Sequence, residues 1–201
     1  MNNTKHILIS ILAFFATACS QSSSNGINTG TGNGGFQYNS LYLNLSNQIS
    51  SSMTDSTSIF TSITNDYDTR IKSEVLYHQG IRPTSVHFGA LDAQVLGLTQ
   101  CNYYSDGTSN CDVTLSNVIN PDTATDPQTK SAREVALGGV LRHELGHAFG
   151  LGHVKNNPMH VMYPYFSSNQ TTESPIEQFI TDLNNFRYNG TASGLPDIST
   201  K

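Results

Sequence analysis

The stretch that decides the fold is HELGHAFGLGH, residues 143–153. His143 and His147 lie four positions apart, so on an α-helix their side chains project from the same face. Their imidazoles could therefore bind one tetrahedral zinc ion at Zn–N distances of about 2.0–2.1 Å. Gly150 is well placed to end this helix, and the chain can then return to the metal with His153 as the third ligand.

Glu144 follows the first of these histidines, which suits a carboxylate that acts on water at the metal. Three protein ligands leave a fourth position for water, as in catalytic rather than structural zinc sites. The zinc ion would lower the pKa of that water towards about 7. Glu144 would then take the proton of the water and return it to the leaving amine. The motif thus predicts hydrolysis at one zinc ion.

Two capping patterns predict helices in the C-terminal half. Ser131 and Glu134 have the capping-box spacing, so we expect the helix that carries the motif to begin there. Ser174, with a proline after it and a glutamate three residues on, predicts a final helix over residues 175–188.

The preceding region combines one helical pattern with several strand patterns. Apolar residues recur every four positions from Ile59 to Val75, which predicts an amphipathic helix that closes at Gly80. Alternating or β-branched segments predict strands at 41–45, 86–88, 94–101 and 112–119. Strands and helices without a regular βαβ alternation indicate an α+β domain.

Composition limits the class of partner and the number of domains. The formal net charge of −5 argues against a nucleic-acid-binding protein, which would normally carry a basic patch. A chain of 201 residues suggests one domain with short appendages. We assign this domain to residues 36–190 and a tail to residues 191–201, and we expect a monomer.

The N-terminal segment is predicted to direct export. Residues 1–18 contain a basic start at Lys5, an apolar run over residues 7–16 and small residues before Cys19. This order is typical of a secretory signal peptide, and the apolar run is too short to span a membrane as a helix. Residues 19–35 are rich in Ser, Gly and Asn, which predicts a flexible tether.

Cys19 leaves two alternatives for the mature N-terminus. Residues 16–19 resemble a bacterial lipobox in which the cysteine receives a lipid, although that pattern prefers Leu where Ala16 stands. The same residues also fit ordinary cleavage by signal peptidase. Lipidation of Cys19 would leave Cys101 and Cys111 as an even pair for a disulfide in an oxidising compartment. The protein is therefore either a lipoprotein of the bacterial cell envelope or a secreted protein. The lipid on Cys19 would be its only expected contact with a membrane.

The motif followed by Val161-Met162-Tyr163-Pro164 resembles the metzincin clan of metalloproteases, and within it the matrixins. The resemblance implies a twisted mixed sheet, a backing helix, an active-site helix and a small C-terminal subdomain with a final helix. It also implies that Met162 lies in a tight turn beneath the zinc ion without binding it.

Two positions differ from the matrixin pattern. Val154 stands where matrixins usually have Ser, and Phe166 stands where they often have Tyr. The cysteine-switch propeptide is also absent from the sequence. These differences favour a minimal bacterial matrixin-like enzyme.

The resemblance further implies how substrate would bind. Residues 112–119 correspond best to the matrixin strand that pairs antiparallel with the substrate. Gly139 would border the S1′ pocket and leave it deep, or it would simply allow the helix to pack closely. Tyr163 and Pro164 would form the outer wall of the pocket.

Other candidate ligands carry weaker signals. We expect surface or packing roles for His78, His87 and His160, because no ligand spacing connects them. Asp122 and Asp126 lie in one loop and could bind calcium, although loop carboxylates are usually only solvated.

The sequence therefore favours a zinc-dependent endopeptidase that acts on extended proteins or peptides. One rival is a non-catalytic zinc-binding lipoprotein of the envelope, against which Glu144 counts because a structural site needs no acid there. A second rival is a zinc amidase, which differs in the shape of its substrate pocket.

Overall fold

We describe a computed structural model of the chain over residues 45–71, 84–103, 109–149 and 151–189. The predicted signal peptide, tether and tail lie outside these residues, as do Cys19, His78 and Gly150, so the predictions for them stay untested. Within the described part, no helix combines the length and the apolar character needed to cross a membrane.

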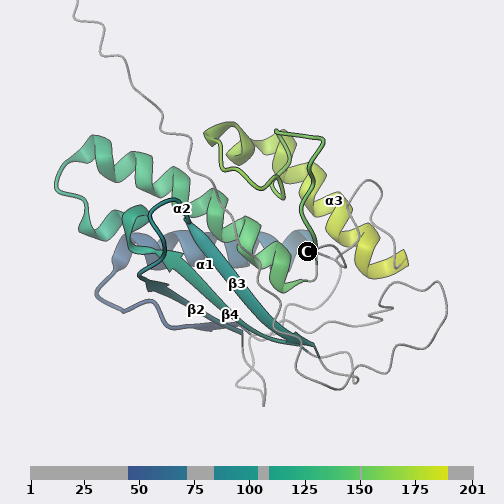
Figure 1. Ribbon diagram of the computed structural model, residues 1–201, viewed down its shortest axis with the longest axis horizontal. Helices are drawn as coiled ribbons and strands as arrows, with labels where there is room; N and C mark the ends of the chain where they lie inside the picture. Colours follow the sequence, from purple (N-terminus) through teal and green to yellow (C-terminus); the bar gives the residue numbers. More distant parts are fainter. Residues whose placement is uncertain (1–44, 72–83, 104–108, 150, 190–201) are drawn as a thin grey trace, which may run out of the picture.

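The strands form a mixed sheet in the order β1-β2-β4-β3 (Figure 1). Their bounds are β1 Leu45–Asn47, β2 Thr84–Gly89, β3 Gly97–Tyr103 and β4 Ser109–Ser116. β1, β2 and β4 run parallel, whereas β3 pairs antiparallel with β4. This arrangement confirms the predicted α+β class with a mixed sheet.

One face of the sheet contributes to the core. Val113 of β4 is fully buried, and its register partners Val86 of β2 and Thr99 of β3 are buried too. Because successive side chains of a strand alternate between faces, Thr114 projects from the opposite face, where it is only half-buried.

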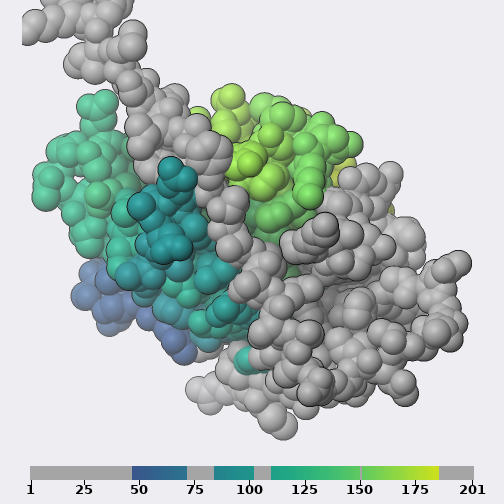
Figure 2. Space-filling view, viewed as in Figure 1, coloured from purple at the N-terminus to yellow at the C-terminus, as the bar shows by residue number. Residues whose placement is uncertain are grey.

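The described residues also form three α-helices and three short 3-10 helices. Their bounds are α1 Thr54–Arg70, η1 Asn117–Ile119, η2 Pro121–Thr123, α2 Pro127–Ala148, η3 Ser168–Thr171 and α3 Glu173–Asn189. α2 contacts β3, β4 and α1. Figure 1 shows α3, in yellow, beside the C-terminal half of α2 and away from the strands. In the space-filling view, green to yellow atoms of the C-terminal part form one group, and the blue atoms of the first described residues lie at the opposite side of this face (Figure 2).

The residue that caps α2 lies five positions earlier than the capping box predicted. The side chain of Asp126 accepts a hydrogen bond from the Thr129 amide at 2.8 Å and caps the helix, with Pro127 in its first turn. Ser131 and Glu134 therefore lie inside the helix, and the predicted start was wrong. Both positions carry a residue that can cap a helix, and the cap at Asp126 makes the helix more than one turn longer than predicted.

α1 ends earlier than predicted. Its last residue is Arg70, and Ile71 already has extended backbone angles of φ −87° and ψ 122°. Ile71 is nevertheless buried in the core. The apolar spacing thus predicted burial correctly at this position but not helical backbone. The predicted helix ends at Arg70, and Val75 and Gly80 lie outside the described residues.

The two loop aspartates considered for calcium both act as helix caps. α1 receives no capping bond from its own N-cap residue, Met53. Instead Asp122 of η2 accepts hydrogen bonds from the amides of Asp55 and Ser56, both at 3.0 Å. Burial alone would raise the pKa of Asp122. The hydrogen bonds from the Ser56 hydroxyl and from the two amides lower it instead. Asp126 caps α2, so both carboxylates have protein partners.

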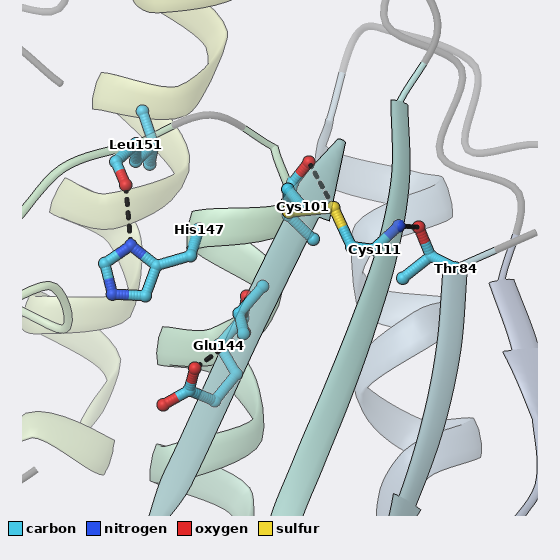
Figure 3. Close-up of a disulfide and its surroundings, with 8 residues drawn as sticks. Thr84, Cys101, Cys111, Glu144, His147 and Leu151 are labelled. Carbon is cyan, nitrogen blue, oxygen red and sulfur yellow. Dashed lines mark hydrogen bonds between the residues drawn. A yellow bond between two sulfur atoms is a disulfide. The ribbon is translucent and has the colours of Figure 1, made fainter. Parts of the chain in front are cut away.

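Cys101 of β3 and Cys111 of β4 form a disulfide between register partners, with a Cα–Cα distance of 4.1 Å. The Cys111 amide also donates to the Thr84 hydroxyl of β2 at 3.2 Å (Figure 3). These bonds fasten three neighbouring strands at one point, next to the end of α2, where the Cys111 sulfur lies 3.9 Å from the Ala148 carbonyl oxygen.

Candidate metal centre

Three histidine side chains converge at the C-terminal end of α2. The Nε2 atoms of His143 and His147 lie 3.1 Å apart, and the Nε2 atom of His153 lies 3.2 Å from each of them. Among the described residues, this is the group of three that could bind a metal ion. α2 supplies two of the histidines, and the segment after the helix supplies the third.

The tautomers of the first two histidines suit metal binding. Nδ1 of His143 donates to the Val161 carbonyl at 2.7 Å. Nδ1 of His147 donates to the Leu151 carbonyl, also at 2.7 Å (Figure 3). A carbonyl oxygen can only accept, so each Nδ1 carries the proton and each Nε2 presents a lone pair. Two lone pairs that face each other have no proton to share, whereas a cation between them would bind both.

Burial keeps these imidazoles neutral. It lowers the pKa of His147 to about 4, with a smaller contribution from nearby His153. Burial also lowers the pKa values of His143 and His153. Neutral imidazoles are the form that binds metals. With the Nε2 spacing near 3.2 Å, which fits tetrahedral zinc at about 2.0–2.1 Å, the donor set is suited to this ion.

Glu144 is buried between α2 and β3, and its carboxylate has one close partner. The Thr99 hydroxyl lies 2.6 Å from Oε2 of Glu144 and 3.1 Å from its backbone oxygen. Burial raises the pKa of Glu144 to about 7, and the hydrogen bond from Thr99 opposes this rise. A Cβ atom on Gly97 would lie 2.5 Å from Oε1, so only a glycine there lets β3 pass this close.

Met162 lies directly beneath the metal-binding part of α2. Its side chain is fully buried, and a Cβ atom on Gly146 would overlap its sulfur. The turn that carries Met162 is closed by a hydrogen bond from the Tyr163 amide to the His160 carbonyl at 2.9 Å.

His160 is part of this turn and is buried, with 2% of its surface exposed. Its Nδ1 accepts a hydrogen bond from the Met162 amide at 2.9 Å, and its Nε2 donates to Asp182 of α3 at 3.1 Å. Burial lowers the pKa of His160, against the opposing effect of Asp182. A surface or packing role was expected for His160, and no sequence pattern pointed to these polar partners.

The space next to Gly139 is filled. A Cβ atom there would overlap the Phe166 ring and lie 2.9 Å from Cγ2 of Thr171. Gly139 therefore allows α2 to pack closely against Phe166 and against Thr171 of η3, which is one of the two roles considered for it. Tyr163 and Pro164 are half-buried beyond this contact.

The prediction that residues 112–119 pair with the substrate was wrong. These residues form most of β4, which already lies between β2 and β3, and then the 3-10 helix η1. β3 is the edge strand of the described sheet, and it carries the residues that contact Glu144. The order of strands depends on non-local pairing, so the spacing of residues along the chain did not reveal it.

His87 lies away from the centre. Its Nδ1 is 3.3 Å from a carboxylate oxygen of Asp112, and its Nε2 is 3.4 Å from the Thr114 hydroxyl. These partners are on the half-buried face of the sheet, and His87 is not part of the metal-binding group among the described residues.

Comparison with known proteins adds one match. The family model described as Matrixin matches residues 55–182, which run from the start of α1 into α3. The matched segment contains the three histidines, Glu144 and the turn at Met162. A search among curated proteins found no match.

Proposed function

Because the chain belongs to the matrixin family of zinc metallopeptidases, we propose that it is an endopeptidase that cleaves extended protein or peptide substrates. One observation carries the proposal. The Nε2 atoms of three histidines converge within 3.2 Å of one another, beside the buried carboxylate of Glu144.

His143, His147 and His153 would hold the zinc ion. When bound there, zinc supplies a Lewis acid that polarises a peptide carbonyl and increases the acidity of water. The carbonyls of Val161 and Leu151 orient two of the imidazoles through their Nδ1 protons. Such outer hydrogen bonds fix the tautomer and the ring orientation of metal ligands.

Glu144 would move the proton. Its carboxylate takes a proton from the attacking water, and the protonated acid donates it to the nitrogen of the leaving amine. A pKa of about 7, raised by burial, suits a group that must accept and release a proton near neutral pH. The Thr99 hydroxyl fixes one carboxylate oxygen, which leaves the other oriented for this transfer.

β3 would align the substrate. An extended peptide can add to the edge of a sheet through main-chain hydrogen bonds, and β3 is the edge strand of the described sheet next to Glu144. A strand that binds a peptide along its length favours cleavage within a chain over removal of terminal residues.

The contacts of Glu144 also bear on the rival hypotheses. A non-catalytic zinc-binding protein would not need a buried carboxylate, which costs free energy unless it is compensated. Here Thr99 donates to that carboxylate and Gly97 makes room for it, so β3 accommodates the acid specifically. A zinc amidase would use the same centre, and the cleaved substrates would distinguish the two.

The test is hydrolysis of a quenched peptide mixture by the purified protein with bound zinc, with and without a chelator. Glu144→Gln removes the base but keeps the shape, so we expect kcat/KM to fall by a factor on the order of 10²–10⁴ while zinc stays bound. Glu134→Gln, on the same helix, is the matched control and should keep wild-type activity.

Two outcomes would oppose the proposal. Full activity of a zinc-bound Glu144→Gln protein would rule out the proposed role of Glu144. A wild-type protein that binds one zinc ion and cleaves no peptide would favour the non-catalytic rival.

A further inference from the structure

We infer that Asp182 and His160 form a positioning pair that fixes the turn at residues 160–163 and, through this turn, two of the three zinc ligands. The inference rests on the metal site proposed above, but it does not depend on peptide hydrolysis. It assigns a role to α3, which contributes no ligand to the metal centre.

The hydrogen bonds of His160 determine its protonation state. Nδ1 accepts from the Met162 amide, so it carries no proton, and Nε2 must then carry the proton that it donates to Asp182. The imidazole therefore connects a backbone amide of the turn to a carboxylate on α3. Neither ring nitrogen is left over for a metal ion.

Asp182 is itself fixed on both sides. Oδ2 accepts from His160, and Oδ1 accepts from the side-chain amide of Gln178 at 2.9 Å, one turn earlier in α3. Asp182 is only 5% exposed, and its neighbour Leu183 is fully buried in the core. A buried carboxylate with both oxygens bonded has little freedom to move, so it can fix the orientation of the His160 ring.

The turn passes this constraint on to the metal centre through two carbonyl groups. The Val161 carbonyl accepts the Nδ1 proton of His143 at 2.7 Å. The Met162 carbonyl accepts from the amide of Val154 at 2.9 Å, and Val154 directly follows His153. Displacement of the turn would therefore move the first ligand and the segment that carries the third.

The test compares three variants by zinc affinity, measured by competition with a chelating dye at a temperature where each variant is folded. Asp182→Leu keeps the approximate size but removes the acceptor, and we expect the Kd for zinc to rise about 10-fold or more, as for loss of outer-sphere partners. Asp182→Asn keeps an oxygen that can accept from His160, so it should restore the Kd to within about threefold of wild type.

Leu183→Ala is the matched control, because it creates a core cavity at the next residue of α3 and breaks no polar contact. We expect it to lower the melting temperature and leave the zinc Kd unchanged. If Asp182→Leu does not fold, His160→Asn replaces it. A shorter Asn side chain can still accept the Met162 amide, as Asn157 does for Met159, but it cannot reach α3.

An unchanged zinc Kd in folded Asp182→Leu or His160→Asn would overturn the inference. An equal loss of affinity in Leu183→Ala would also overturn it, because general destabilisation would then explain the effect. Absence of zinc binding in the wild-type protein would contradict the proposed metal site itself, which separates the two failures.

Discussion

At the scale of single residues, the Thr99 hydroxyl controls how the Glu144 carboxylate is presented. Its bond to Oε2 is short, at 2.6 Å, and lies in a buried environment where hydrogen bonds to a charged group are worth about 1.5–3 kcal/mol. The bond stabilises the ionised carboxylate and restricts its orientation. Both effects concern the form of Glu144 that accepts a proton.

We expect Thr99→Val to lower kcat roughly 10-fold with little change in KM, because the carboxylate loses its orienting partner. The bond lowers the pKa of Glu144, so its removal should also move the acidic limb of the pH–rate profile to higher pH. Thr99→Ser keeps the hydroxyl and should stay close to wild type. A Val variant with an unchanged kcat and profile would show that Thr99 has no part in presenting the base.

The residues of the site differ in how far sequence could predict them. The three histidines and Glu144 were predictable because eleven consecutive residues contain them, and helical spacing converts such a pattern directly into geometry. Thr99 contacts Glu144 across 45 positions, and Asp182 contacts His160 across 22 positions. No local pattern encodes such contacts, so the structure was needed to identify these partners.

At the scale of elements, the start of α1 depends on a residue from another element. Asp122 accepts from two amides of the first turn of α1 and from the Ser56 hydroxyl. We expect Asp122→Ala to reduce the free energy of unfolding by about 1–2 kcal/mol, as for loss of a strong cap. Urea unfolding of the metal-free protein would measure this change.

Asp126→Ala is the comparison for this prediction. Asp126 caps α2 from an exposed position, so its loss should cost less than the loss of Asp122. Added calcium should not change the melting temperature of the wild-type protein, because both carboxylates already serve as caps. A calcium-dependent rise that disappears in Asp122→Ala would instead support a calcium site.

The elements themselves were predicted better than their boundaries. The three α-helices of the described residues were all expected from apolar spacing and capping residues, but α2 is capped by Asp126 and not by Ser131. The end of α1 was also misplaced, since Ile71 is buried on extended backbone. The spacing of apolar residues predicts which side chains are buried, and at Ile71 this prediction holds although the backbone is no longer helical.

At the scale of the whole molecule, the α+β class followed from the sequence but the strand order did not. Residues 112–119 had the β-branched content of a strand, and most of them lie in β4, which has neighbours on both sides and buried side chains on one face. That same central position excludes β4 from pairing with a substrate. The strand pattern thus identified an interior strand, whereas the edge proposed to bind substrate is β3.

Burial of titratable groups around the metal centre makes the stability of the metal-free protein depend on pH. Folding lowers the pKa of four histidines from 6.5, namely His143, His147, His153 and His160. Below about pH 6.5 the unfolded chain therefore binds more protons than the folded chain, and stability falls as the pH falls towards the lower folded values. Glu144 has the opposite effect, because folding raises its pKa from 4.5 to about 7. As the pH falls, the folded state binds this proton before the unfolded state does, which stabilises the folded state.

With four histidines against one glutamate, we expect the melting temperature of the chelator-treated protein to fall between pH 7 and pH 5, as measured by circular dichroism. Glu144→Gln removes the opposing contribution of Glu144, so the fall should be steeper in this variant. Bound zinc should raise the melting temperature most at neutral pH, where the imidazoles are unprotonated, and lose this effect as protons compete for the ligands. A metal-free protein that is equally stable at pH 7 and pH 5 would mean that the histidines are more accessible to water than their burial indicates.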